Sequence, residues 1–222
     1  MPAQSAVTGQ VLVCGLGRFG AATALALTRL GHDVLGIDRD PALVQEWASR
    51  LGRTVQTDTT KMEALEHLEA GDVPVAVVGI GTSVESSVLT CSNLVELGVP
   101  QIWAKAITQA HGTILERIGV HRVVYPESDA GMRVAHLVTG KLLDYIEFDD
   151  GFAIVKMRPP SETRGFTLGE SQIRKKYGVT VVGVKSPGRD FTYAVPDTKV
   201  TEHDLLIVSG HSDLIERFAA RP

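Results

Sequence analysis

A regular alternation of short apolar segments with helical segments, over the first two thirds of the chain, most constrains its fold. Segments with strand character lie at residues 11–14, 34–37, 55–58, 75–79, 101–104 and 122–125. The stretches between them have helical spacing and cover residues 18–30, 41–51, 61–70, 83–97 and 108–118. Short, uniformly apolar strands separated by helices are typical of a parallel sheet covered on both faces. The pattern therefore predicts an α/β fold with a Rossmann-like doubly wound parallel sheet.

The character of the sequence changes after this region. A helical stretch over 128–143 is followed by strand-like runs at 145–148, 152–157, 179–184 and 205–208. Helices are expected over 169–177 and 212–218. The pattern predicts two domains: residues 1–143 as a nucleotide-binding domain that includes the crossover helix, and residues 144–222 as a small α+β C-terminal lobe.

Composition excludes several classes of protein. With 44% hydrophobic residues in 222, the chain has material for a core and is not disordered. A net charge of −4 and 5% aromatic residues argue against a dedicated nucleic-acid binder. The longest apolar stretch, residues 73–80, has the length of a strand, and Met1–Gln10 lacks the basic residues of a signal peptide. We therefore expect a cytoplasmic protein in which Cys14 and Cys91 are buried, reduced thiols.

One glycine-rich motif indicates nucleotide binding. Gly15, Gly17 and Gly20 follow a predicted strand and open a predicted helix, which is the context of the dinucleotide-binding fingerprint. Gly15 permits the tight turn, Gly17 lets phosphate oxygens approach the backbone, and Gly20 allows close packing of helix and strand. The start of the helix adds free N–H groups and a partial positive charge.

Further candidates follow the other strands at the same edge of the sheet. Asp38 ends the second strand, where a carboxylate accepts hydrogen bonds from ribose hydroxyls and repels the 2′-phosphate of NADP. Asp58 and Ser83 are also explained as helix caps, and Lys105 as surface charge. The candidate nucleotide-binding residues are Gly15, Leu16, Gly17, Arg18, Phe19, Gly20, Asp38, Arg39, Asp58, Thr59, Gly79, Ile80, Gly81, Ser83 and Lys105.

Motifs of several enzyme classes are absent from the sequence. The pair Gly140-Lys141 lacks the leading glycine and the following Ser or Thr of a Walker loop. There is no nucleophile elbow, no zinc-protease motif and no Cys-x-x-Cys, and the seven histidines are scattered singly. The sequence therefore gives no convincing catalytic pair and no transition-metal site.

The glycine motif and several later segments together resemble the TrkA/KtrA family, the cytoplasmic gating subunits of bacterial potassium-uptake channels, which are built from RCK (regulator of potassium conductance) domains. The resemblance runs from about residue 10 to residue 218. Its N-terminal part is carried by Gly15-Leu-Gly-Arg-Phe-Gly20, Asp38, Trp103–Ala106, Ile114–Val120 and Arg122–Glu127. Its C-terminal part is carried by Ile173–Gly178, Val179–Lys185, Pro196-Asp197 and Asp204–Gly210.

The resemblance implies a regulator rather than an enzyme. It implies dimers assembled into a ring, expected to be an octamer, at the inner face of the membrane beneath a potassium or sodium channel subunit of the KtrB or TrkH kind. Gly-Arg-Phe-Gly is similar to the KtrA type, in which ATP activates and ADP inactivates. In that type Arg18 reaches toward the terminal phosphate, and Glu127 helps to hold Mg²⁺ or another cation at the nucleotides.

Two points of the resemblance leave the ligands open. Asp58 is a negative charge where KtrA-like chains carry a neutral residue, so the NAD(H) response of TrkA-like regulators stays an alternative. Some relatives bind cyclic di-AMP in a C-terminal cleft, which Ile173, Arg174 and Pro196 match loosely. Thr180 stands near a position where a more strongly bonding side chain such as Asn is expected.

Two other classes of protein compete with the gating subunit. A small NAD-dependent dehydrogenase needs an acid/base group beside the nicotinamide, and about eighty residues of second lobe offer none that is evident. A redox-sensing transcription factor needs a winged helix and a basic face, which the sequence lacks. We therefore expect nucleotide-controlled regulation of ion flux, without a nucleic-acid partner.

Overall fold

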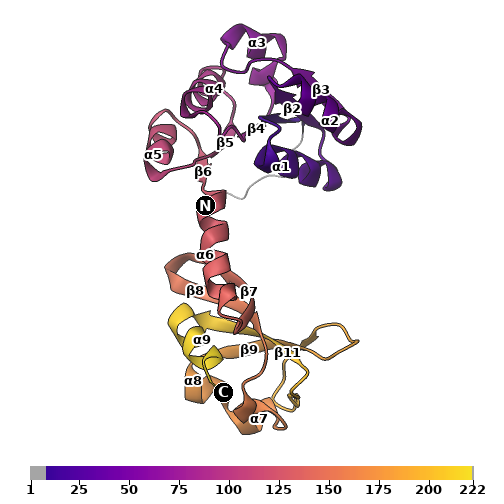
Figure 1. Cartoon of the computed structure of the whole chain (residues 1–222), viewed down its shortest axis with the longest axis vertical. Helices are drawn as coiled ribbons and strands as arrows, with labels where there is room; N and C mark the ends of the chain where they lie inside the picture. Colours follow the sequence, from indigo (N-terminus) through magenta and orange to yellow (C-terminus); the bar gives the residue numbers. More distant parts are fainter. Residues whose placement is uncertain (1–8, 222) are drawn as a thin grey trace. The chain divides into compact units, whose positions relative to one another are not determined.

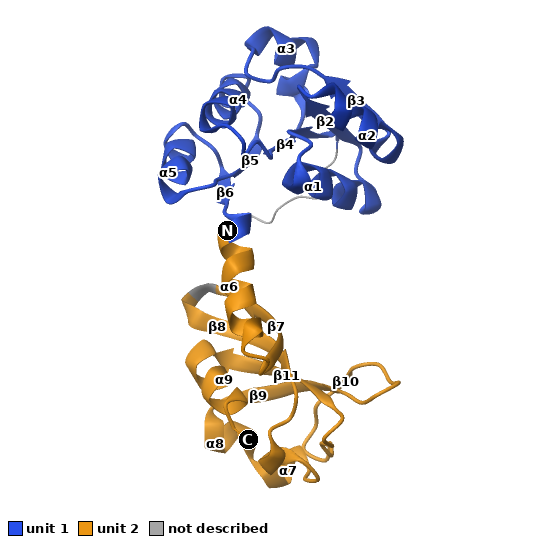
Figure 2. Cartoon of the chain, viewed as in Figure 1, with its two compact units in different colours: residues 1–127 blue, residues 128–222 orange. Residues whose placement is uncertain are grey.

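The computed structural model describes residues 9–221, which form two compact units, residues 9–127 and 128–221 (Figure 2). The expectation that no signal peptide is present concerns residues 1–10, and residues 1–8 lie outside the described part.

The first unit is built on a six-stranded parallel sheet in the order β3-β2-β1-β4-β5-β6 (Figure 1). The strands are β1 (Val11–Cys14), β2 (Val34–Asp38), β3 (Arg53–Gln56), β4 (Val75–Val78), β5 (Gln101–Lys105) and β6 (Arg122–Val124). The order reverses at β1, from which the chain first builds toward β3 and then toward β6. This confirms the predicted doubly wound sheet, and a crevice for ligands is expected beside the carboxyl end of β1.

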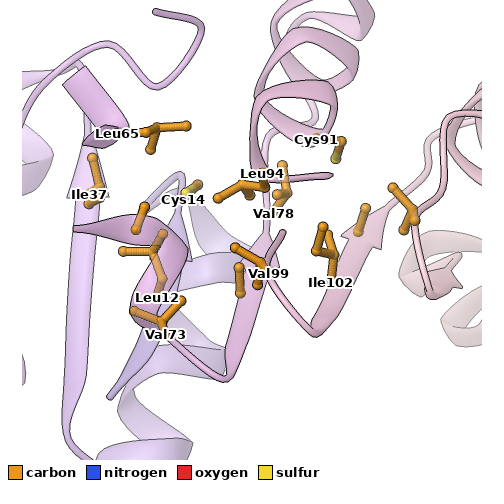
Figure 3. Packing of buried hydrophobic residues seen from close by; sticks show 14 of the residues in the cluster. Leu12, Cys14, Ile37, Leu65, Val73, Val78, Cys91, Leu94, Val99 and Ile102 are labelled. Carbon is orange, nitrogen blue, oxygen red and sulfur yellow. The ribbon is translucent and has the colours of Figure 1, made fainter. Parts of the chain in front are cut away.

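Helices cover both faces of this sheet, and every side chain of the central strand β1 is therefore buried. Leu12 and Cys14 point into a core shared with α3, α4 and α5, part of which Figure 3 shows, whereas Val11 and Val13 point into a second core with α1 and α2. The cysteine thiols are free and buried, and desolvation raises the pKa of Cys91 to about 12. The helices are α1 (Arg18–Arg29), α2 (Pro41–Leu51), α3 (Met62–His67), α4 (Val84–Glu96) and α5 (Gln109–Arg117).

The second unit is a five-stranded antiparallel sheet in the order β10-β9-β11-β8-β7 with short helices. Its own core includes Met157, Leu206 and Phe218. The strands are β7 (Leu142–Glu147), β8 (Phe152–Met157), β9 (Thr180–Lys185), β10 (Thr192–Tyr193) and β11 (Leu205–His211). The helices are α7 (Leu168–Ser171), α8 (Ile173–Tyr177) and α9 (Ser212–Ala219), and α6 (Pro126–Val138) precedes β7.

The boundary between the two units lies between Glu127 and Ser128, whereas the sequence pattern predicts a domain boundary after residue 143. The difference is helix α6, whose contacts beyond Glu127 are made with the second unit. Arg133 pairs with Asp144, and Leu137 packs against the core of that unit. Within residues 9–221 no helix combines the length and hydrophobicity that crossing a bilayer requires.

Several predicted elements differ from the observed ones. The helix expected at 61–70 ends at His67, the strand expected at 145–148 lies at 142–147, and the strand expected at 205–208 extends to His211. The strand expected at 55–58 lies at 53–56, the helix expected at 128–143 ends at Val138, and the helix expected at 169–177 is two short helices. Gly140, with φ +73°, follows the end of α6, and β7 begins at Leu142. Gln172 adopts φ +49° between α7 and α8, and this left-handed residue ends the first helix.

Candidate functional site: a nucleotide cavity at the sheet edge

A cavity of about 320 Å³ lies at the carboxyl edge of the parallel sheet, where the loops after β1, β2, β3 and β4 meet. Its size suits a nucleotide-sized ligand, and its position is the crevice that the strand order predicts. The lining residues are Gly15, Gly17, Ile37, Asp38, Arg39, Asp40, Leu43, Thr57, Asp58, Thr59, Thr60, Gly79, Ile80, Gly81, Thr82 and Ser86.

The glycine loop turns sharply between β1 and α1. Gly15 has φ +93°, which favours glycine, and its N–H donates to the Ile37 carbonyl at 2.7 Å. Gly20 packs so closely on this turn that a Cβ there would collide with the Gly15 carbonyl oxygen. A Cβ on Gly17 would meet no atom within 4 Å, and Gly17 is the N-cap of α1 without a side-chain hydrogen bond. The start of α1 therefore offers open space and unpaired N–H groups to an anion.

Asp38 joins this loop to the end of β2. Its Oδ2 accepts from the Leu16 N–H at 2.7 Å, and its Oδ1 accepts from the Asp40 N–H at 2.9 Å. These two bonds fix the carboxylate at the cavity, and each oxygen keeps a further lone pair. The arrangement can accept hydrogen bonds from the two hydroxyls of a ribose.

Asp58 is held by its neighbour Thr60 in the loop after β3. The Oδ1 atom accepts from the Thr60 Oγ1–H at 2.7 Å and from the Thr60 N–H at 3.1 Å. These hydrogen bonds, helped by the charges of Lys61 and Arg39, hold the pKa of Asp58 below its usual value. Asp58 is therefore an ionised hydrogen-bond acceptor at neutral pH.

Lys105 and Glu127 form a second group beside the cavity. Lys105 Nζ donates to Glu127 Oε1 at 2.5 Å, lies 6.0 Å from the centre of the Phe19 ring, and would be 3.2 Å from a Cβ on Gly81. The hydrogen bond from Lys105 lowers the pKa of Glu127, and Arg18 adds to the effect. The Lys105 side chain is only 12% exposed, so this ammonium is fixed at the rim of the nucleotide cavity.

Some of the predicted residues do not line the cavity. Ser83 caps α4 by accepting from the Ser86 N–H at 3.1 Å, which is the structural alternative given above. Thr59 lines the cavity, but its hydroxyl is turned to a buried hydrogen bond with Thr90 Oγ1 at 2.8 Å. The predicted residues outside the cavity lining are Leu16, Arg18, Phe19, Gly20, Ser83, Lys105 and Glu127.

Several lining residues were not predicted from the sequence. Thr57 and Thr60 lie within two residues of Asp58, and Asp40 lies two residues after Asp38. Thr82 and Ser86 lie within three residues of Ser83. Their closeness to predicted residues is a usable signal because a whole loop, and not one residue of it, forms each side of the cavity. Leu43 comes from the first turns of α2, and it carries no such signal.

Whether Glu127 can bind a cation depends on its exposure and on its ion pair with Lys105. The side chain is exposed, and its Oε1 is paired with Lys105, so this carboxylate would supply one oxygen to a cation. A hard divalent cation takes six or more oxygen ligands, and the phosphates of a nucleotide supply the same kind of oxygen. Within residues 9–221 no group of three or more His, Cys, Asp or Glu side chains could hold a metal ion.

The residues considered for cyclic di-AMP lie in the second unit. Ile173 is buried in the core of that unit, whereas Arg174 and Pro196 are exposed and Thr180 is partly exposed on β9. Ile173 therefore presents no apolar surface to a ligand in this structure.

Comparison with known proteins matches both units to families. Residues 11–126 match the TrkA-N domain, and residues 152–221 match the TrkA-C domain. The chain is 33% identical over 210 residues to Ktr system potassium uptake protein A of Bacillus subtilis (strain 168), covering 94% of this chain and 95% of that protein. This chain belongs to the TrkA/KtrA family. The resemblance stated from the sequence is thereby confirmed.

Two solved structures share the fold of this TrkA/KtrA family member. The GsuK RCK domain has a TM-score of 0.66 at 20% identity, and covers 100% of this chain and 49% of the GsuK chain. The GsuK channel bound to NAD has a TM-score of 0.65 at 19% identity, and covers 100% of this chain and 41% of that chain. The family member thus spans half or less of these GsuK chains, and at this identity the likeness shows the fold alone.

Proposed function

We propose that this protein is a nucleotide-binding regulatory subunit of a potassium-uptake system. It acts from the cytoplasmic side on a membrane-embedded channel subunit of the KtrB or TrkH kind, and it regulates rather than catalyses. One observation carries the proposal: the glycine loop, the open start of α1 and the fixed Asp38 carboxylate share one cavity in a chain of the TrkA/KtrA family.

ATP and ADP are the proposed ligands. Nucleotide control of a gate requires that each nucleotide stabilise a different conformation of the assembly, because a ligand shifts an equilibrium only by its difference in affinity for the two states. The terminal phosphate distinguishes ATP from ADP. Arg18 is the first residue of α1, and Lys105 lies at the rim beside Gly81, so these two cations are the proposed contacts of that phosphate. Mg²⁺ at the phosphates, with Glu127 as one ligand, belongs to the same proposal.

Assembly into dimers and an octameric ring is also proposed. Helix α6 supports it: the helix has no buried residue within the described chain, and Met132, Val134 and Val138 are exposed by more than half. Such apolar exposure on one helix is typical of a surface that a partner covers. Cyclic di-AMP binding to the second unit stays a prediction, and the burial of Ile173 means that the side chain would have to move first.

The test is a thermal-shift series on the purified protein with ATP, ADP, NADH and NADPH, with and without Mg²⁺. Stabilisation grows with the ratio of ligand concentration to dissociation constant, so the order of the shifts gives the order of affinities. We expect ATP and ADP to give the largest shifts. Arg18→Ala should reduce the ATP shift more than the ADP shift. Arg29→Ala, which removes an exposed arginine at the other end of α1, is the matched control and should change neither.

Two outcomes would contradict the proposal. Stabilisation by NADH alone would make the ligand a dinucleotide and reopen the dehydrogenase alternative, which NADH oxidation assays with carbonyl substrates then test. Equal loss of the ATP and ADP shifts in Arg18→Ala would remove the role of this arginine at the terminal phosphate.

A further inference from the structure

We propose that Thr90 on α4 is a positioning residue for the nucleotide cavity, and that it acts through a buried hydrogen bond to Thr59. The bond holds the loop after β3 against α4, and that loop forms one wall of the cavity. The inference rests on the proposed function, because it takes a nucleotide as the occupant of the cavity. It assigns a part in binding to a residue that does not itself line the cavity.

The loop after β3 supplies four consecutive lining residues of the cavity, Thr57, Asp58, Thr59 and Thr60. Its start is tied to β2, because the Thr57 N–H donates to the Asp38 carbonyl oxygen at 3.0 Å. Its turn is shaped from within, by the hydrogen bonds from Thr60 to Asp58. Neither contact fixes the middle of the loop against the helices of the first unit.

Two hydrogen bonds to α4 fix the middle of this loop. The hydroxyl oxygens of Thr59 and Thr90 are 2.8 Å apart, and either hydroxyl can donate. The Asn93 side-chain amide, one turn further along α4, donates to the Thr59 carbonyl oxygen at 3.3 Å. Thr59 is 5% exposed and Thr90 is fully buried, so water does not compete for the bond between the two hydroxyls.

Thr90 differs from the other helical threonines of the first unit. The hydroxyls of Thr23, Thr28 and Thr113 each donate to the carbonyl oxygen four residues earlier in the same helix, at 3.0 Å. Within residues 9–221 no such bond is found for Thr90, whose hydroxyl is paired with Thr59 instead. Threonine is no better a helix former than valine, which has the same shape. The hydroxyl at this fully buried position is therefore explained by its partner in the loop.

Helix α4 is a firm support for the loop because it is anchored in the core of the first unit. Cys91, next to Thr90, and Leu94, one turn further on, are fully buried in the core that Figure 3 shows. The same helix begins beside the cavity, where Ser86 is a lining residue. The pair of threonines therefore fixes two walls of the cavity relative to each other, the loop after β3 and the first turn of α4.

Removal of the Thr90 hydroxyl alone should release the loop. Thr90→Val keeps the volume of the side chain, but the buried Thr59 hydroxyl loses its partner, and the loop satisfies this hydroxyl only by moving toward water. Movement of this wall displaces the lining groups from the ligand. We expect ADP to bind about fivefold more weakly, which is the factor that one hydrogen bond gives.

The experiment compares ADP affinity, from calorimetric titration of the whole protein, with the melting temperature of each variant. Thr90→Ser keeps the hydroxyl but loses a buried methyl group, so it should melt at a lower temperature and bind ADP as the wild-type protein does. The double variant Thr59→Val with Thr90→Val leaves no hydroxyl unpaired, so its melting temperature should return close to that of the wild type while its ADP affinity stays reduced. Affinity then follows the hydroxyl pair, whereas a merely structural role makes it follow the melting temperature.

Hydrogen exchange measured by NMR without nucleotide tests the position of the loop directly. Thr90→Val should speed exchange of the Thr60 and Lys61 N–H groups about fivefold, because release of the loop opens their hydrogen bonds to Asp58. Exchange in the glycine loop should not change. Thr28→Val is the matched control, because it removes a hydroxyl that bonds only within α1, and it should alter neither the loop after β3 nor ADP affinity.

The outcomes that overturn the inference are specific. Wild-type ADP affinity or wild-type loop exchange in Thr90→Val would show that the loop keeps its place without the bond. ADP affinity that returned together with the melting temperature in the double variant would show that packing, and not the hydrogen bond, positions the loop. Both results leave the proposed function standing. Absence of ADP binding by the wild-type protein would overturn the proposed function and this inference with it.

Discussion

Gly17 and Gly20 lie in the same loop, yet a methyl group added to each would meet different surroundings. At Gly20 it collides with the Gly15 carbonyl oxygen, whereas at Gly17 it enters open space in the cavity. We expect Gly20→Ala to lower the free energy of unfolding by about 3 kcal/mol, because backbone must move to admit the methyl group. Gly17→Ala should leave stability nearly unchanged and weaken ADP binding, because the added atom takes space at the start of α1.

Urea unfolding and an ADP titration measure the two effects separately. Each variant is the control for the other, since the same atom is added three residues apart. Equal destabilisation by both substitutions would show that the loop relaxes around any side chain. Unchanged ADP binding in Gly17→Ala would show that phosphate does not approach the backbone at this position.

At the residue scale, the sequence predicts the parts of the site that are made by short-range geometry. The glycine loop and Asp38 were predicted because a turn between strand and helix needs glycine, and because the second strand ends at a fixed spacing after it. The direction of the Thr59 hydroxyl was not predictable, since Thr59 lies in the loop after β3 and its partner Thr90 is 31 residues away on α4. The helix cap at Ser83 could be predicted from the neighbouring sequence. A contact between Ser83 and a ligand could not be predicted in this way.

His136 fastens helix α6 to the second unit through two contacts. Its ring is stacked on Tyr145 with 3.9 Å between ring centroids, and its Nδ1 lies 2.9 Å from Glu216 Oε1 on α9. We expect His136→Ala to speed hydrogen exchange in α6 and α9 by roughly tenfold, because a stacked pair contributes about 1 kcal/mol and the contact with Glu216 adds to it. Exchange followed by mass spectrometry reports each helix separately.

Lys141→Ala is the matched control for this change, because Lys141 lines the same hollow between α6 and α9 but is exposed and makes no ion pair within residues 9–221. Unaltered exchange of α6 in His136→Ala would mean that Leu137 and the ion pair of Arg133 with Asp144 hold the helix without it.

Among the elements of the parallel sheet, the buried strands were predicted well, whereas the edge strand β3 was predicted two residues too late. Strands β1, β2 and β4 are almost wholly buried, so their sequences are uniformly apolar and easy to recognise. Strand β3 lies at the edge of the sheet and reads Arg-Thr-Val-Gln, a pattern that carries little periodicity. The break at Gln172 escaped prediction because a glutamine in a left-handed conformation has no marker in the sequence.

At the scale of the whole molecule, the hydrophobic cores of residues 9–221 fall into two groups that share no residue. The two cores of the first unit draw on residues before α6, and the core of the second unit draws on residues from Leu137 onward. The sequence predicted this division from the change in strand character near the middle of the chain. The predicted boundary lies beyond α6. The sequence could not show that α6 belongs to the second unit, because the helix contacts residues far along the chain, such as Glu216.

Separate cores predict two unfolding transitions in scanning calorimetry. Leu12→Ala should lower only the transition of the first unit, and Leu206→Ala only that of the second, each by about 3 kcal/mol, since both side chains are fully buried. ADP at a hundred times its dissociation constant should stabilise the transition that Leu12→Ala moves, by about 2.7 kcal/mol. It should leave the other in place, because the nucleotide cavity is lined by the first unit alone.

A single transition that moves with either leucine would contradict this expectation, because the units would then unfold together. If ADP moved both of two separate transitions, a change at the cavity would already reach the second unit within one chain. Helix α6 is the element that would carry it, since Glu127 at its start pairs with Lys105 at the cavity rim and the rest of the helix packs on the second unit. Calorimetry of Glu127→Gln tests whether the ion pair with Lys105 transmits this change. The substitution should abolish the ADP-induced shift of the second transition if the pair transmits it, and should leave that shift intact if it does not.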